Sequence, residues 1–313
     1  MMLARVADSL YWLGRYVERV EHLARLSTVM LDATLDRTDA AAQAAQMARA
    51  ALGDPEPGRS IQPLESARAL VLDRDSDGSV VVSLAHAREN ARQVRDQITS
   101  ETWERLNMLY LRATGARAER AFEANAPAFL HEAISDLHLF KGAADATMSH
   151  GEGWRFMMAG VHIERAQLMA RLLKVCFQEG PGPNLDDHMA LVSLLRMACA
   201  LEPYLRTYTA DLNAHNILAF LLFDEDFPRS IRFSTARLEE HFSHLSRGRD
   251  LGRVDPARIA GRLNARLAYS DVEDVEATGA WALLTAVEEE CSAINKAMHE
   301  SFVAYPLELR LPA

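Results

Sequence analysis

GRYVERVEHLARL occupies Gly14–Leu26, and GVHIERAQLMARL occupies Gly160–Leu172. The two stretches share the opening glycine, the Glu-Arg pair and the closing Ala-Arg-Leu. Each match in the second copy lies 146 positions after its counterpart in the first. A motif repeated at one spacing indicates duplication of a structural unit. The repeat therefore predicts two related units, each built around one copy.

A weaker repeat pairs Arg92–Arg95 (RQVR) with Arg229–Arg232 (RSIR), in the same order along the chain. Together the repeats predict related halves at residues 1–150 and 151–313, joined at the glycine-rich turn Gly151–Gly153. With only two copies, a bundle with pseudo-twofold symmetry is favoured over an open solenoid. We therefore expect the whole chain to form a single domain with two internal repeats.

Apolar residues recur at i, i+3, i+4 and i+7 along most of the chain, a spacing typical of amphipathic helices. Alternating patterns typical of strands are almost absent, and Gly78–Val82 is the single candidate. Asn184–Asp186 and Asp255-Pro256 are typical of helix starts. The sequence thus predicts an all-α multi-helix bundle. The expected helices are Leu3–Leu35, Ala40–Leu52, Val81–Arg112, Ala118–Met148, Trp154–Phe177, Asp186–Leu212, Ser230–Ser246, Pro256–Tyr269 and Glu273–Phe302.

The composition is typical of a globular protein, with 49% hydrophobic and 25% charged residues. The longest apolar run, Ile217–Phe223, is far shorter than the ~20 residues that cross a bilayer, and the charged N-terminus lacks a signal-peptide core. A net charge of -10 argues against general nucleic-acid binding, which needs a basic surface. The three cysteines form no C-x-x-C pair, which suits a reducing compartment. We expect a cytoplasmic protein without membrane or general nucleic-acid partners.

On a helix, the glycine, the glutamate and the second arginine of each motif share one face, because each residue turns the helix by about 100°. A glycine inside a helix costs about 1 kcal/mol relative to alanine, so its recurrence indicates close approach of another helix. Glutamate and arginine are seven residues apart, too far for a local pair, so they need partners on other helices or a ligand. A buried ion-pair network and a ligand site between the halves both remain open. The residues are Gly14, Glu18 and Arg25 in the first copy and Gly160, Glu164 and Arg171 in the second.

The segment Glu89–Asp96 is also rich in charge. Glu89 and Arg92 lie three residues apart, and Arg92 and Asp96 four apart, so local salt bridges on a solvated face are one interpretation. The repeat of Arg92 and Arg95 as Arg229 and Arg232 favours the other, a shared polar surface.

The stretch from Asp145 to Arg155 collects titratable and aromatic side chains at a predicted helix junction. His150 lies beside flexible glycine, and the exposed backbone donors of a helix start can bind anions. Helix capping explains the same residues without a ligand.

Motifs for independent catalysis are absent from the sequence. No glutamate has a histidine three residues on, as a di-iron bundle requires, and no P-loop, dinucleotide-binding glycine motif or nucleophile elbow occurs. His241 and His244 lie three apart without a further ligand, so we expect no metal site and identify no catalytic residue.

Four stretches together resemble the bacterial alpha-E family, in the family's order and over nearly the whole chain. They are ADSLYWLGRYVERVEHLARL at Ala7–Leu26, ENARQVRDQITSETWERLN at Glu89–Asn107, DATMSHGEGWRFMMAGVHIERAQLMARLL at Asp145–Leu173 and FPRSIRF at Phe227–Phe233. The second copy departs from the family's pattern at Val161 and His162, where relatives tend to keep Arg-Tyr. The resemblance and the repeat together indicate as binding residues Arg15, Glu18, Arg19, Arg25, Glu89, Asn90, Arg92, Arg95, Asp96, His150, Glu152, Trp154, Glu164, Arg165, Arg171, Arg229 and Arg232.

The resemblance implies an all-helical protein that works with a circularly permuted ATP-grasp protein, often with a transglutaminase-like peptidase encoded nearby. The ATP-grasp partner would bind ATP and Mg and activate a carboxylate as an acyl phosphate, which an amine then attacks. This chain would be the helper of an ATP-dependent amide or peptide ligase, without a cofactor of its own. It would bind a peptide, an amino acid or the partner through its Arg/Glu faces. Two alternatives remain: a helical adaptor with a purely structural Glu/Arg network, and an independent enzyme that uses His150 and Glu152 as acid and base.

Overall fold

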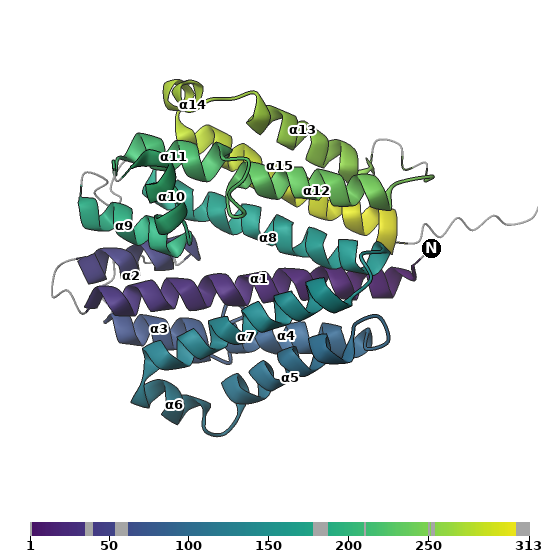
Figure 1. The fold of residues 1–313 in the computed structure, drawn as a ribbon, viewed down its shortest axis with the longest axis horizontal. Coiled ribbons are helices and arrows are strands. Elements are labelled where there is room, and N and C mark those ends of the chain that lie inside the picture. The colour runs from purple at the N-terminus through teal and green to yellow at the C-terminus, as the bar shows by residue number, and fades with distance from the viewer. Residues whose placement is uncertain are drawn as a thin grey trace, which may run out of the picture.

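The computed structural model describes residues 2–34, 40–53, 62–177, 187–209, 211–249, 251 and 254–304. Within these ranges all regular structure is helical, so the prediction of an all-α bundle is confirmed (Figure 1). A π-helical turn, His299–Val303, follows the last α-helix. The α-helices are α1 (Ala4–Ala33), α2 (Ala40–Ala51), α3 (Pro63–Leu72), α4 (Val80–Gln93), α5 (Ser100–Thr114), α6 (Ala118–Ala124), α7 (Ala126–Thr147), α8 (Glu152–Cys176), α9 (His188–Met197), α10 (Leu201–Tyr208), α11 (Ala214–Phe223), α12 (Ile231–Leu245), α13 (Pro256–Ala268), α14 (Val272–Thr278) and α15 (Ala280–Met298).

The two long helices that carry the repeated motif, α1 and α8, lie side by side through the middle of the bundle (Figure 1). They run parallel, since Met2 contacts Glu152 near their N-terminal ends and Arg19 contacts Glu164 farther along. Helices α4 and α7 pack on α1, while α12 and α15 pack on α8. The motif face of each central helix is therefore buried against other helices.

The two glycines of the motif explain how closely α1 and α8 approach. A Cβ atom at Gly14 would overlap the carbonyl oxygen of Met157 and lie 3.0 Å from the amide nitrogen of Val161. A Cβ atom at Gly160 would likewise overlap the carbonyl oxygen of Tyr11. Only glycine leaves room for backbone against backbone here, so the predicted close approach is present, and the two copies make it against each other.

A second internal match lies in the loops that lead into α4 and α12. Asp73 and Asp224 each end a helix and accept a bond from the amide two residues on, at 2.9 and 3.0 Å. Ser230 lies 151 positions after Ser79, the same spacing that separates Asp224 from Asp73. Each serine caps the next helix through its hydroxyl group. The two loops therefore have the same design.

This match corrects the weaker repeat predicted from the sequence. Arg92 and Arg95 lie at and just beyond the end of α4, whereas Arg229 and Arg232 flank the start of α12. The two arginine pairs are therefore not structural equivalents, and the similarity of RQVR and RSIR is not a structural repeat. The division into halves 1–150 and 151–313 stays a prediction.

Several predicted helices are interrupted where a side chain or backbone conformation caps a new helix. Thr99 caps α5 and Asn125 caps α7, which breaks the expected helices Val81–Arg112 and Ala118–Met148. Positive φ angles of 55° at Cys199 and 85° at Gly279 mark the breaks within Asp186–Leu212 and Glu273–Phe302. Such breaks preserve apolar periodicity on both sides, so periodicity alone does not reveal them.

Two helices, α3 and α11, were not predicted. Helix α11 coincides largely with the apolar run Ile217–Phe223, which is buried at nearly every position and so lacks a polar face. Asp255 caps α13 with Pro256 at its first position, as expected, but the predicted start at Asn184–Asp186 lies outside the described residues. Val80–Val82, in the strand candidate, open α4. None of the helices in the described part of the chain combines the length and the apolar character that a membrane crossing requires.

Candidate functional site

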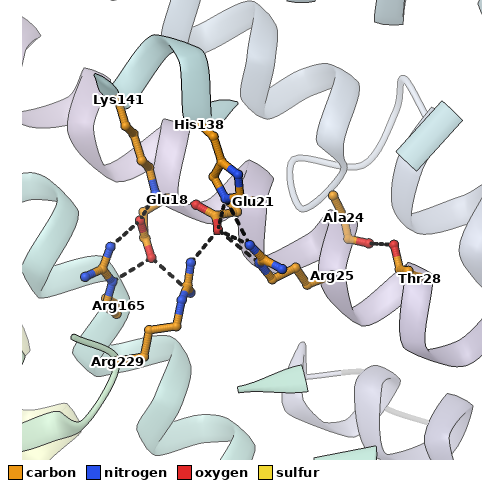
Figure 2. Close-up of polar contacts among 9 residues, drawn as sticks. All are labelled: Glu18, Glu21, Ala24, Arg25, Thr28, His138, Lys141, Arg165 and Arg229. Carbon is orange, nitrogen blue, oxygen red and sulfur yellow. Dashed lines mark hydrogen bonds and ion pairs between the residues drawn. The ribbon is translucent and has the colours of Figure 1, made fainter. Parts of the chain in front are cut away.

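Glu18 and Glu21, both on α1 and each 1% exposed, form the centre of a buried ionic cluster (Figure 2). Arg165 of α8 donates a hydrogen bond to each carboxylate oxygen of Glu18, at 2.7 and 3.0 Å. Lys141 of α7 lies 2.5 Å from Glu18 and also contacts Glu21. Arg229, just before α12, lies 3.3 Å from Glu18 and 2.5 Å from Glu21. The cluster thus joins four segments that are far apart in the sequence.

The cations keep both carboxylates ionised despite their burial. Burial by itself would raise the pKa of Glu18 and of Glu21, but the neighbouring positive charges outweigh it and hold both pKa values well below the usual range. Burial lowers the pKa of His22 to about 4, with Arg229 adding to the shift, so this histidine is neutral. With Arg25, four cations surround two carboxylates. The cluster therefore carries surplus positive charge.

Glu164, on α8, is the centre of a second buried cluster that mirrors part of the first. It accepts hydrogen bonds of 2.7 Å from Arg15 and from Arg19, both on α1. Arg15 also donates to Gln167 and to Asn295 of α15. Arg19 with Glu164 and Arg165 with Glu18 form the same contact with the two helices exchanged. The Glu-Arg pair of each motif copy thus serves the other copy.

The second arginine of each motif behaves differently from the expectation. Arg25 binds Glu21, four residues before it on the same helix, at 2.9 Å, and also contacts His138. Its main charge partner is therefore local, and the prediction of a partner on another helix or a ligand is wrong for Arg25, because Glu21 rather than Glu18 lies four residues before it. Arg171 is half exposed and lies 3.3 Å from Glu288 of α15.

A pocket of about 230 Å³ opens beside the first cluster. Lys141 and Arg165 line it together with Asp145, whose side chain is largely exposed. The remaining wall is apolar and aromatic and comprises Gly14, Val17, Phe140, Ala144, Trp154, Met157, Met158 and Val161.

Trp154 adds an unsatisfied donor to this region. Its indole nitrogen is buried and has no hydrogen-bond partner among the described residues. Buried polar groups are normally paired, so this unpaired donor distinguishes Trp154 among the residues that line the pocket. The ring stacks on His150, with centroids 3.9 Å apart.

The other junction residues have structural contacts. His150 is exposed and contacts Asp145, and its ring stacks on Trp154. Glu152 accepts hydrogen bonds from the backbone nitrogen of Met2 and from Arg249, so it links both residues to the first turn of α8.

The residues of the Glu89–Asp96 segment do not join the buried clusters. Glu89 and Arg92 form an exposed pair, in which the hydrogen bond from Arg92 lowers the pKa of Glu89 to about 2. Asn90 donates to the backbone of His86, and Asp96 accepts from Gln97. Arg95 lies over the ring of Trp103. Local pairing on a solvated face is therefore the interpretation that the contacts favour.

The arginines repeated after this segment have separate environments too. Arg229 is buried in the first cluster, whereas Arg232 binds exposed Glu225 at 2.9 Å. The predicted surface shared by Arg92, Arg95, Arg229 and Arg232 is therefore not formed.

Lys141, Glu21, Gln167 and Asn295 complete the clusters but were not predicted as site residues. The sequence does mark Lys141 as unusual, because it is one of only three lysines in the chain and lies in an apolar helical stretch. Glu21 lies on the predicted motif face. Gln167 and Asn295 have no sequence feature that marks them, since their role depends on Arg15 reaching them across the bundle.

Comparison with known proteins gives relatives without an assigned activity. Two uncharacterized proteins, Mb2597 of Mycobacterium bovis and MT2643 of Mycobacterium tuberculosis, are each 28% identical to the chain over 98% of its length. Rv2567 of Mycobacterium tuberculosis is 27% identical over the same share. The chain spans 37% of the length of each. No solved structure matches the chain.

The family comparison fits the geometry. Residues 2–303 match the model of Alpha-E, described as a predicted alpha-helical domain with a conserved ER motif. Each copy of the repeated motif contains a Glu-Arg dipeptide, Glu18-Arg19 and Glu164-Arg165, and both dipeptides lie in the buried clusters. Because the match covers nearly the whole chain, this protein belongs to the Alpha-E family.

Proposed function

We propose that this protein is the helper of an ATP-dependent amide or peptide ligase and that it binds an amino acid or peptide end in the pocket beside Lys141 and Arg165. A separate circularly permuted ATP-grasp protein would bind ATP and Mg and form the acyl phosphate. The family resemblance supplies this partner, and a nearby transglutaminase-like peptidase and a cytoplasmic location belong to the same proposal. The greater length of the relatives supports a domain that works beside others.

The observation that carries the proposal is the surplus positive charge at the edge of the apolar pocket. Lys141, Arg165 and two further cations surround two carboxylates, so the cluster has positive charge left to pair with another anion. A substrate carboxylate would bind these two side chains through charge-assisted hydrogen bonds.

The rest of the pocket suits the other parts of an amino acid. Asp145 can bind an ammonium group, and the methionine and aromatic wall can cover an apolar side chain. The volume of about 230 Å³ limits the buried part to one residue of a peptide. The chain would hold this substrate while the partner supplies the activated carboxylate, and the amine attack would release phosphate.

The test is an ATP-dependent ligation assay with the chain and its neighbouring ATP-grasp protein, following ADP release as amino acids and dipeptides are varied. Lys141→Gln removes the partly exposed cation but leaves both arginines on Glu18. We expect the KM for the amino acid or peptide to rise by about tenfold, the effect of losing one charge-assisted hydrogen bond. Lys296→Gln, on the exposed face of α15, is the matched control and should leave KM unchanged. Full activity of the ATP-grasp protein alone would refute the proposal.

The competing function is a helical adaptor whose ionic clusters only fix the packing. The near-complete burial of Glu18 and Glu164 favours it, because buried pairs of this kind brace helices whether or not a ligand is present. An adaptor requires Lys141→Gln to alter stability or partner binding while the KM for the substrate stays constant.

A further inference from the structure

A second cavity, of about 490 Å³, is lined by residues of α1, α2, α3 and α8 and by the loop before α4. Three arginines line it from three helices: Arg19 of α1, Arg49 of α2 and Arg171 of α8. Among the lining residues that the structure describes, Asp77 is the single acidic one, and four leucines form the apolar wall. The described lining therefore holds more arginines than carboxylates.

The matching loops explain why this space is open. Ser79 and Ser230 occupy the same place in the two loops, so the residue before each, Gly78 and Arg229, corresponds as well. Arg229 fills the space beside α1 and binds Glu18 and Glu21. Gly78 has no side chain and lies in the lining of the second cavity. The cavity thus occupies the place that an arginine fills in the other loop.

Two carboxylates near this cavity are each shared between two cations. Glu164 is shared between Arg15 and Arg19, and Glu288 is shared between Arg171 and Lys174. Each carboxylate therefore serves two cations. On α8 the residue that matches Glu21 is the neutral Gln167, so the carboxylate that Arg229 binds in the first cluster has no charged counterpart here.

We propose that this cavity binds the oxyanion of a small molecule, a carboxylate or a phosphate, between Arg19, Arg49 and Arg171. Guanidinium groups suit either anion because their planar forks make paired hydrogen bonds to two oxygens. The leucine wall takes the apolar part of the ligand. The site is distinct from the pocket at Lys141 and does not depend on it.

The test is isothermal titration calorimetry of the full chain with inorganic phosphate, pyrophosphate and succinate. We expect at least one of the three to bind, and a preference for pyrophosphate or for succinate identifies phosphate or carboxylate as the ligand group. Arg171→Gln should weaken binding by about tenfold, the effect of one charge-assisted hydrogen bond. Arg171 is half exposed, so the fold should tolerate this change.

Gly78→Arg is the second variant and copies the arrangement of the other loop. A Cβ atom at Gly78 would meet only the Ser76 hydroxyl, at 3.6 Å, so the side chain can enter the cavity without backbone strain. This variant should abolish binding, whereas Arg237→Gln, an exposed arginine paired with Glu240, should bind as the native protein does. The proposal is overturned if no probe binds at about 10 mM, or if both cavity variants bind as tightly as the native chain. Lys141→Gln should leave anion binding in this cavity unchanged. The anion-site proposal and the proposed ligase role can therefore fail independently of each other.

Discussion

Replacing Gly14 with alanine should destabilise the protein at the crossing of its two central helices. The added methyl group would overlap the carbonyl oxygen of Met157 and lie 2.9 Å from its carbonyl carbon and 3.0 Å from the amide nitrogen of Val161. All three atoms belong to the backbone of α8, so no side-chain rotation relieves the overlap. The two helices must therefore move apart, which also lengthens the contacts between Glu18 and Arg165 a turn farther on.

The size of the effect is a balance of two terms. Overpacking a tight core contact costs about 1 to 3 kcal/mol and more where the backbone must shift, while alanine gains about 1 kcal/mol over glycine in a helix. Because only backbone can yield here, the overpacking cost lies at or above the top of its range, about 3 to 4 kcal/mol, which leaves a net loss of about 2 to 3 kcal/mol. At an unfolding entropy of about 2.1 cal/mol/K per residue, this lowers Tm by about 3 to 5 °C.

Urea unfolding followed by circular dichroism at the helical band measures this loss. Gly142→Ala is the matched control, since a Cβ atom at that exposed position of α7 meets no atom within 4 Å and the variant should be slightly stabilised. Equal stability of the Gly14→Ala and Gly142→Ala variants would refute the assigned close packing of α1 on α8.

Two further predictions concern the buried charges and histidines. Glu18→Gln should lower the free energy of unfolding, measured in urea, by about 3 to 5 kcal/mol, because it leaves buried cations without their partner. Glu89→Gln on the exposed face should change the free energy of unfolding little, and similar losses for both variants would contradict the assigned burial. Acid should destabilise the protein well before its carboxylates protonate. Burial lowers the pKa of His22 and His241 to about 4 and that of His162 well below its usual value, so the unfolded chain binds protons at these sites first. Stability should be full above about pH 6.5 and fall by about 1.4 kcal/mol per pH unit for each histidine as pH drops toward 4; urea midpoints that stay constant across this range would exclude neutral buried histidines.

The helical class and the importance of the motif could be predicted because both are local properties. Apolar spacing along α1 and α8 requires helices whatever they pack against, and a glycine repeated on the glutamate's face requires a close neighbour. The helix breaks at Asn125 and Gly279 could not be predicted from the same spacing, because the apolar pattern continues on both sides of each break.

The partners of the charged residues illustrate the opposite case. Sequence spacing correctly showed that Glu18 is not paired with Arg25 but gave no means to find Lys141, 123 residues away, or Arg229, 211 residues away. The similarity of RQVR to RSIR was misleading, since two matching arginines three residues apart carry no information on which end of a helix they lie at. Position in the loop, set by Asp73 and Asp224, reveals the true correspondence.

The amino-acid pattern was enough to show that the chain is helical, that it repeats a Gly-Glu-Arg face, and that this face has a close neighbour. The packed molecule was needed to show that the neighbour is the second copy of the same face and that four cations share two carboxylates beside it. It was also needed to show that Gly78 borders a cavity whereas Arg229, its match in the other loop, lies in a buried cluster. Helix formation and periodicity depend on residues within a few turns. Ionic partners and cavities depend instead on which distant segments the packed core brings within a few ångströms of each other.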